Sequence, residues 1–168
     1  NLFYVAFDMQ HHADYTSIAF FDTDEIGTHP FEWWRDVDNA TTYQRPDAVS
    51  HWWRTYIIHQ GTDDYPYFGK YIDEEGTNFS GWSKMNYPYA TSDSYHSLAS
   101  HNDRLFHAVK GSSGEMFIRD SWDGGDTWDE FRSIGRYTTT GFDLVSHNGD
   151  LCIAHKGSNN NHIYVGCA

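Results

Sequence analysis

Three stretches of the chain place a polar side chain directly before a glycine, and they are the first candidates for ligand contacts. They are His59-Gln60-Gly61, Val109-Lys110-Gly111 and His155-Lys156-Gly157. Imidazole and ammonium groups donate hydrogen bonds, carboxylates accept them, and aromatic rings offer an apolar face. Such groups match the hydroxyls and C–H faces of a neutral sugar. We therefore predict sugar contacts where these stretches enter the loops that follow them.

The predicted sugar-binding set adds residues of the adjoining loops and turns to these stretches. It comprises His59, Gln60, Asp63, Tyr65, Lys110, Ser112, His155, Lys156, Asn159, Trp52 and Trp53. The aromatic members, or Tyr67, would supply a stacking face. Similar groups recur at similar places, which favours binding over catalysis, because an enzyme needs one site that departs from the repeat.

A second recurring pattern is the pair Ser-His. It occurs as Ser50-His51, Ser100-His101-Asn102 and Ser146-His147-Asn148. Serine and histidine side chains bond readily to nearby backbone and to each other. We predict that they stabilise turns, and a repeated sugar site is the alternative. Because strand direction alternates, these pairs should lie at the opposite end of the strands from the glycine stretches.

Both patterns belong to a longer internal repeat. Residues 95–111 and 141–157 coincide at Leu, Ser-His-Asn, Leu, Ala and Lys-Gly with an offset of 46. Gly27, Gly76 and Gly125 are spaced by 49 residues, and an aromatic follows each after six, namely Trp33, Trp82 and Phe131. Repeats of this length indicate a repeated supersecondary unit. We predict a single repeat domain over 1–168, with approximate repeats 1–46, 47–94, 95–140 and 141–168.

Each repeat is predicted to form four short antiparallel strands. In the third repeat they cover 97–101, 105–110, 115–121 and 128–134. The dipeptide Asn148-Gly149 is a strong hairpin signal, because both central residues of a type I′ turn need positive φ. No helical periodicity is present. The chain begins at the second strand of the first repeat and ends after the third strand of the last. A longer array, two cooperating chains and open edges are all compatible with this.

An eight-residue motif closes the third repeat. Ser121-Trp122-Asp123-Gly124-Gly125-Asp126-Thr127-Trp128 matches S-x-D-x-G-x-T-W at every fixed position. We expect Ser121 and Asp123 to cap backbone N–H groups of a tight turn, Gly125 to take a conformation forbidden to other residues, and Trp128 to fill the space between sheets. The second repeat, over 72–79, keeps the acid, the glycine and the aromatic.

This motif resembles the Asp-box, or bacterial neuraminidase repeat, of sialidase-like β-propellers. The Ser-His-Asn segments also resemble short repeats of microbial and fungal propeller lectins. The resemblance implies an all-β, propeller-like array of about four antiparallel four-stranded blades, the first and last incomplete. It also implies that the Asp-box, Ser121, Asp123, Gly125, Thr127 and Trp128, is structural and lies on the face away from the binding site.

Charge and cysteine placement bound the partners and the compartment. The chain carries 11 Lys and Arg against 24 Asp and Glu, a net charge of -13. Such a field repels phosphate backbones and anionic lipid headgroups, so we expect neither nucleic acid binding nor membrane insertion. Cys152 and Cys167 flank a turn-rich stretch. They could form a disulfide across a hairpin or remain separate thiols, and we expect an extracellular protein.

The predicted function is a carbohydrate-binding lectin with several weak glycan sites, and a homo-oligomer is compatible with it. One alternative is a glycoside hydrolase or sialidase-related enzyme, although no catalytic residues can be named. The other is a non-catalytic protein-interaction module. No cofactor is predicted, since no Cys-x-x-Cys or His-Glu-x-x-His spacing occurs. Calcium at Asp22, Asp24 and Glu25, or at Asp123 and Asp126, is the only metal candidate.

Overall fold

The computed structural model describes residues 3–8, 17–22, 34–36, 40–42, 44–71, 78–88 and 94–168. These residues form strands and turns, with no helix among them. The first sheet contains β1 (Phe3–Asp8), β2 (Ser17–Asp22) and β3 (Trp34–Asp36). The second contains β4 (Asp47–His51), β5 (Arg54–Gln60), β6 (Pro66–Tyr71) and β7 (Phe79–Lys84).

The third and fourth sheets continue the same order. The third sheet contains β8 (His96–His101), β9 (Arg104–Lys110), β10 (Glu115–Ser121) and β11 (Arg132–Tyr137). The fourth contains β12 (Phe142–His147), β13 (Asp150–Lys156) and β14 (Ile163–Cys167). Every pair of neighbouring strands is antiparallel. The predicted all-β, propeller-like fold is confirmed.

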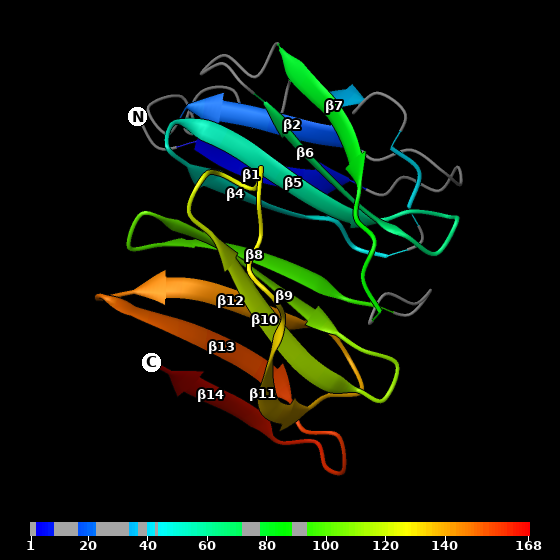
Figure 1. The fold of residues 1–168 in the computed structure, drawn as a ribbon, viewed down its shortest axis with the longest axis vertical. Coiled ribbons are helices and arrows are strands. Elements are labelled where there is room, and N and C mark those ends of the chain that lie inside the picture. Colours follow the sequence, from blue (N-terminus) through cyan, green and yellow to red (C-terminus); the bar gives the residue numbers. More distant parts are fainter. Residues whose placement is uncertain are drawn as a thin grey trace.

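From the second sheet to the fourth, the sheets follow one another along the long axis of the molecule as far as the red strand β14, and the blue strands β1 and β2 overlap the second sheet in this view (Figure 1). Strand β8 lies between β4 and β12, so the leading strands of three successive sheets are neighbours. The four sheets that the structure describes do not close into a ring. In the second, third and fourth sheets the leading strand turns back into the next strand through a tight hairpin, at one end of the sheet.

The hairpin turns share one backbone conformation. Asn148 has a φ of 51° and Gly149 a φ of 91°, which confirms the predicted turn. In the second sheet the same two positions are Trp52 and Trp53, with φ of 47° and 62°. Positive φ is uncommon for bulky side chains. The surrounding sheet therefore imposes this turn on two tryptophans that would not form it by local preference.

Two of the three buried clusters among the described residues lie between neighbouring sheets. One buried cluster joins the second and third sheets through Tyr56, Ile58, Phe68, Met85, Leu98 and Leu105. A second joins the third and fourth through Ala99, Phe106, Ala108, Met116, Phe142 and Leu144. Each large apolar side chain contributes about 1.5–3 kcal/mol when fully buried. Neighbouring sheets therefore stabilise one another.

The eight-residue motif at residues 121–128 forms the turn that leads from β10 towards β11. The Ser121 hydroxyl accepts a hydrogen bond from the Gly125 amide at 2.8 Å. The Asp123 carboxylate accepts from the Thr127 amide at 2.8 Å and from the Thr127 hydroxyl at 2.6 Å. These bonds hold the pKa of Asp123 down at about 2. Capping by Ser121 and Asp123, as predicted, is confirmed.

The residues that follow pack the turn onto the neighbouring sheet. Gly125 has a φ of 84°, and a Cβ there would approach the Phe68 ring to 2.5 Å. Trp128 meets the same ring edge-on, with centroids 5.5 Å apart. Trp128 therefore fills the space between the second and third sheets, as expected. Because the turn extends past it, β11 begins at Arg132, four residues later than predicted.

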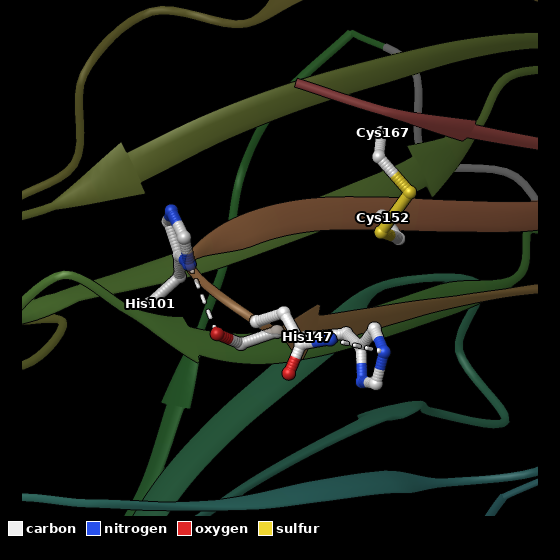
Figure 2. Close-up of a disulfide and its surroundings, with 6 residues drawn as sticks. His101, His147, Cys152 and Cys167 are labelled. Carbon is white, nitrogen blue, oxygen red and sulfur yellow. Dashed lines mark hydrogen bonds between the residues drawn. A yellow bond between two sulfur atoms is a disulfide. The ribbon is translucent and has the colours of Figure 1, made fainter.

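Two further expectations have different outcomes. Trp82 and Phe131 are half-buried, whereas Trp33 and residues 72–77 of the degenerate second motif lie outside the described residues. Cys152 and Cys167 are register partners on β13 and β14, and a disulfide joins them with their Cα atoms 4.0 Å apart (Figure 2). Of the two alternatives that the sequence left open, the structure has the bridge. The described part of the chain has no helix that could cross a membrane.

Candidate functional site

Two cavities occupy equivalent places in the second and fourth sheets. The first cradle, as we call it, has a volume of about 240 Å³ and is lined by Thr41, His59, Gly61, Thr62, Asp63, Tyr67 and Trp82. The second cradle, of about 440 Å³, is lined by Gly135, Arg136, Tyr137, His155, Gly157, Ser158, Asn159, Asn160 and Tyr164. The first lies where β5 turns into β6, and the second where β13 turns into β14.

A stacked histidine and tyrosine form one wall of each cradle. His59 and Tyr67 are register partners, with ring centroids 5.5 Å apart and planes 18° from parallel. His155 and Tyr164 are partners in the same way, at 5.5 Å and 22°. The two walls are therefore copies of one arrangement.

Glycine beside each stack is required by space. A Cβ added to Gly61 would lie 2.6 Å from the Tyr67 ring, and one added to Gly157 would lie 2.7 Å from the Tyr164 ring. In both sheets the tyrosine lies directly over the backbone of the glycine. The recurring glycine in the sequence thus marks a close approach of ring to backbone.

In the first cradle a carboxylate anchors the tyrosine. Asp63 accepts hydrogen bonds from the Tyr67 hydroxyl at 2.8 Å and from the Lys84 ammonium at 2.9 Å. The Tyr65 amide also donates to it, at 3.3 Å. Its bond to Lys84 lowers the pKa of Asp63 and raises the pKa of the lysine. The ammonium also lies 3.5 Å above the centroid of the exposed Tyr65 ring.

In the second cradle an amide takes the place of that carboxylate. Asn160 accepts from the His162 amide at 3.0 Å and donates to the Tyr164 hydroxyl at 3.1 Å. Its bond to a backbone N–H two residues later matches that of Asp63. The direction at the tyrosine differs, because the Tyr164 hydroxyl accepts here and keeps its own proton for another partner.

His59 is the most constrained polar side chain of the first cradle. It is 3% exposed, and neither ring nitrogen makes a hydrogen bond within the described residues. Burial lowers the pKa of His59 to about 4, against smaller opposing effects of the Gln60 backbone and Asp63. The ring is therefore neutral at pH 7, with one donor and one acceptor. A ligand hydroxyl could satisfy either, and an unmet buried polar group costs about 1–3 kcal/mol.

The third sheet has no equivalent cradle. The positions of His59 and Tyr67 are taken by Val109 and Phe117, which are register partners on β9 and β10. Gly111 is retained there. Lys110 lies with its ammonium 5.1 Å from the Tyr95 ring centroid and, like the exposed Ser112, lines neither cradle.

The other predicted contacts lie apart from the cradles. Gln60 is buried, and its side-chain oxygen lies 2.9 Å from His96 Nε2, so it points into the core. Trp52 and Trp53 lie at the hairpin end of β5, away from His59, and Trp52 stacks on His51 at 4.4 Å. Lys156 is half-buried on β13 and lines neither cradle.

The structure thus brings together part of the predicted set and adds residues to it. His59 and Asp63 line the first cradle, and His155 and Asn159 line the second. Trp82, Arg136, Asn160 and Tyr164 line the cradles without having been predicted as ligand contacts, and Lys84 lies beside the first cradle through its bond to Asp63. The sequence did hold a signal for Tyr164, because a tyrosine follows the His-x-Gly stretch in both repeats. In the structure that tyrosine pairs with the histidine across the turn, Tyr67 with His59 and Tyr164 with His155.

A larger cavity of about 660 Å³ lies between the third and fourth sheets. Apolar side chains line much of it, including Ile118, Ile134, Leu151, Ile153 and Val165. Arg136, His155 and Tyr164 line both this cavity and the second cradle. The second cradle therefore adjoins an apolar inter-sheet space, which the first cradle does not share.

The candidate calcium groups are engaged within the protein or lie outside the described side chains. Asp123 holds the turn after β10 through its bonds to Thr127, and Asp126 pairs with Lys70 at 2.7 Å. The side chains of Asp22, Asp24 and Glu25 are not among those described. In the part of the chain that the structure describes, no three His, Cys, Asp or Glu side chains are grouped to hold a metal.

Comparison with known proteins adds a relationship of fold. No protein-family model matches the chain, and no curated protein matches it in sequence. A triple arginine-to-alanine mutant of AofleA from Arthrobotrys oligospora is similar in structure, with a TM-score of 0.60, 12% identity, and coverage of 92% of this chain and 46% of that one.

Two further solved structures show the same likeness. Aleuria aurantia lectin, in complex with α-methyl-L-fucoside, gives a TM-score of 0.55 at 13% identity over 92% of this chain and 52% of the lectin. Trypanosoma rangeli sialidase, in complex with the inhibitor DANA, gives 0.53 at 8% over 90% and 26%. The chain spans about half the length of the first two proteins and a quarter of the third. It shares with them a β-propeller-type fold.

Proposed function

We propose that this chain is a carbohydrate-binding lectin whose glycan sites include the two cradles. The observation that carries the proposal is repetition: a stacked histidine and tyrosine over a glycine, with a polar side chain on the tyrosine hydroxyl, occurs in two sheets. Binding modules use several similar sites, whereas catalysis needs one distinct constellation. A lectin that holds a fucoside is among the proteins of similar fold.

In this proposal the first cradle holds a single sugar residue. Its volume of about 240 Å³ lies below the roughly 300–1,000 Å³ typical of pockets for drug-sized ligands. The C–H face of the sugar would lie against Trp82 or Tyr67, the neutral His59 ring would bond one hydroxyl, and Asp63 would accept from another. Each site would be weak, and linked sites would gain strength by multivalency.

The proposal includes an extracellular location and glycans as the partners. The disulfide between Cys152 and Cys167 supports that location, because disulfides persist in oxidising compartments and are rare in the cytosol. A net charge of -13 argues against nucleic acid and anionic membranes as partners. Neither consideration selects a particular sugar.

The decisive experiment is a glycan array followed by calorimetry with the best ligand. His59→Phe keeps a ring in the first cradle and removes both nitrogens, so it should weaken that site at least tenfold. Ser112→Ala, at the loop of the sheet that lacks a cradle, is the matched control and should change nothing. Absence of any glycan binding by the wild type would defeat the proposal. Turnover of a fluorogenic glycoside in that case would instead favour the hydrolase alternative.

A further inference from the structure

We infer that the two cradles select sugars of different charge, and that the second cradle takes an acidic sugar, one carrying a carboxylate or sulfate group. The inference rests on the proposed function, since it concerns which glycan each cradle accepts. Both cradles have the same histidine, tyrosine and glycine arrangement, and three differences around it support the inference.

The first difference is the charge of the group that anchors the tyrosine. Asp63 in the first cradle is ionised, because its bond to Lys84 lowers its pKa. Asn160 occupies the same place in the second cradle and carries no charge. An acidic sugar entering the first cradle would meet a carboxylate, and one entering the second would meet an amide. The repulsive group is thus present in only one of the two sites.

The second difference is an arginine without an acidic partner. Arg136 on β11 is exposed and lines the second cradle, and no ion pair or hydrogen bond involves it among the described residues. Other arginines of the third sheet are committed: Arg104 and Arg132 both pair with the buried Asp120, and Arg119 lies among aromatic rings. Arg136 is therefore a free guanidinium in a chain of net charge -13.

The cations of the two cradles differ in the same sense. The Lys84 ammonium, beside the first cradle, is already bonded to Asp63 at 2.9 Å, so it is not free to bind an anionic ligand. No carboxylate lines the second cradle among the described residues. A guanidinium presents a planar fork of donors that suits carboxylate and sulfate oxygens.

The third difference is the direction of the hydrogen bond at the tyrosine. Tyr67 donates its proton to Asp63, so only its oxygen lone pairs remain for a ligand. Tyr164 accepts from Asn160 and keeps its proton. The Asn160 orientation is fixed by its other bond, in which Oδ1 accepts from the His162 amide. The second cradle can thus direct two donors, the Tyr164 hydroxyl and the Arg136 guanidinium, at one anionic group.

The test uses the full chain and three matched probes: glucose, glucuronate and glucose 6-sulfate. Titration followed by NMR of the His155 and His59 ring protons reports each cradle separately. We expect the second cradle to bind at least one anionic probe ten times more tightly than glucose, with the preference falling as salt is raised. The two anionic arms show whether a carboxylate or a sulfate is the better ligand. The first cradle should show no such preference.

Variants assign the preference to its groups. Arg136→Gln should reduce the anionic preference at least fivefold, because it weakens binding of the anionic probes more than binding of glucose. Arg54→Gln is the matched control, because it removes one exposed positive charge at the other end of a sheet. Asn160→Asp should abolish anionic binding at the second cradle, because it places a carboxylate where the first cradle has Asp63.

Each outcome separates the two claims. Equal binding of glucose and both anions at the second cradle would overturn the inference while leaving the lectin proposal standing. An anionic preference that Arg136→Gln does not reduce would overturn it as well. If none of the three probes binds and the glycan array is also blank, the proposed function falls, and the inference falls with it.

Discussion

His51 and Ser100 are joined across neighbouring sheets by a hydrogen bond of 2.8 Å between Nδ1 and Oγ. The same bond recurs one sheet further on, where His101 Nδ1 lies 2.9 Å from the Ser146 hydroxyl (Figure 2). Asn102 holds the other ring nitrogen of His101, at 2.9 Å. The Ser-His repeat in the sequence therefore ties sheets together, since His51 and His101 each bond the serine of the following repeat.

We predict that Ser146→Ala destabilises the chain by about 1 kcal/mol, because it removes the partner of a histidine that is 9% exposed. The measurement is the free energy of unfolding in urea. Ser112→Ala, at an exposed serine in the loop between β9 and β10, should change it by less than about 0.5 kcal/mol. A Ser100→Ala and His51→Ala double-mutant cycle with no coupling energy would show that the ties add no stability.

Glycine at the cradles is the subject of a second prediction. Gly61→Ala should destabilise the fold by about 1–3 kcal/mol and weaken sugar binding, since its methyl group would lie 2.6 Å from the Tyr67 ring. Gly166→Ala on β14 is the matched control, because nothing lies within 4 Å of its Cβ position. Calorimetric titration and urea unfolding measure both effects. Equal behaviour of the two variants would mean that the stacked ring moves aside freely.

Much of the fold could be predicted from the sequence, because the strands and turns recur at the spacing of the sequence repeat. The positive φ that Asn148-Gly149 requires is a local property of those residues, so the hairpin was predictable. The start of β11 was not. Side-chain bonds from Ser121 and Asp123 extend the turn beyond Trp128, and strand propensity does not reveal how far such bonds reach.

The cradles were accessible only in part. His59 and Asp63 flank one turn, so their neighbourhood followed from chain proximity. Asn160 was missed because the turn after β13 is one residue longer than the turn after β5, which shifts the equivalent position by one. Arg136 comes from another sheet, and repeat spacing does not say which side chains of neighbouring sheets face each other.

Acid should unfold the chain because it carries buried neutral histidines. Burial lowers the pKa of His59 to about 4, of His96 to about 3, and of His107 well below its ordinary value. The unfolded chain protonates these rings below about pH 6.5 while the folded chain does not. Their stabilising contribution is therefore complete above that pH and is lost as the pH falls towards the folded values.

One carboxyl group acts in the opposite sense. Burial raises the pKa of Asp47 to about 6, so below that pH the folded state gains a proton that the unfolded state lacks. Below pH 6 the unfolded chain binds a proton on each of the three histidines, and the folded chain binds one on Asp47, so the unfolded chain binds about two protons more. The free energy of unfolding should therefore fall by roughly 3 kcal/mol per pH unit between pH 6 and 5. Urea unfolding at several pH values measures this. His59→Phe should reduce the slope by about 1.4 kcal/mol per pH unit, and an unchanged slope would contradict the assignment.

Reduction of the disulfide should disable the second cradle before the first. Strand β14 pairs only with β13 among the described strands, and the Cys152–Cys167 bridge ties the two together 15 residues apart in sequence. A bridge closing a loop of that length is worth about 3 kcal/mol. Without it β14 should fray, and Tyr164 on that strand would leave its place beside His155.

NMR titration of the Cys152→Ala and Cys167→Ala double variant should therefore show intact binding at the first cradle and weakened binding at the second. Equal loss at both would mean that the sheets unfold together, and no loss at either would mean that backbone pairing alone holds β14 in place.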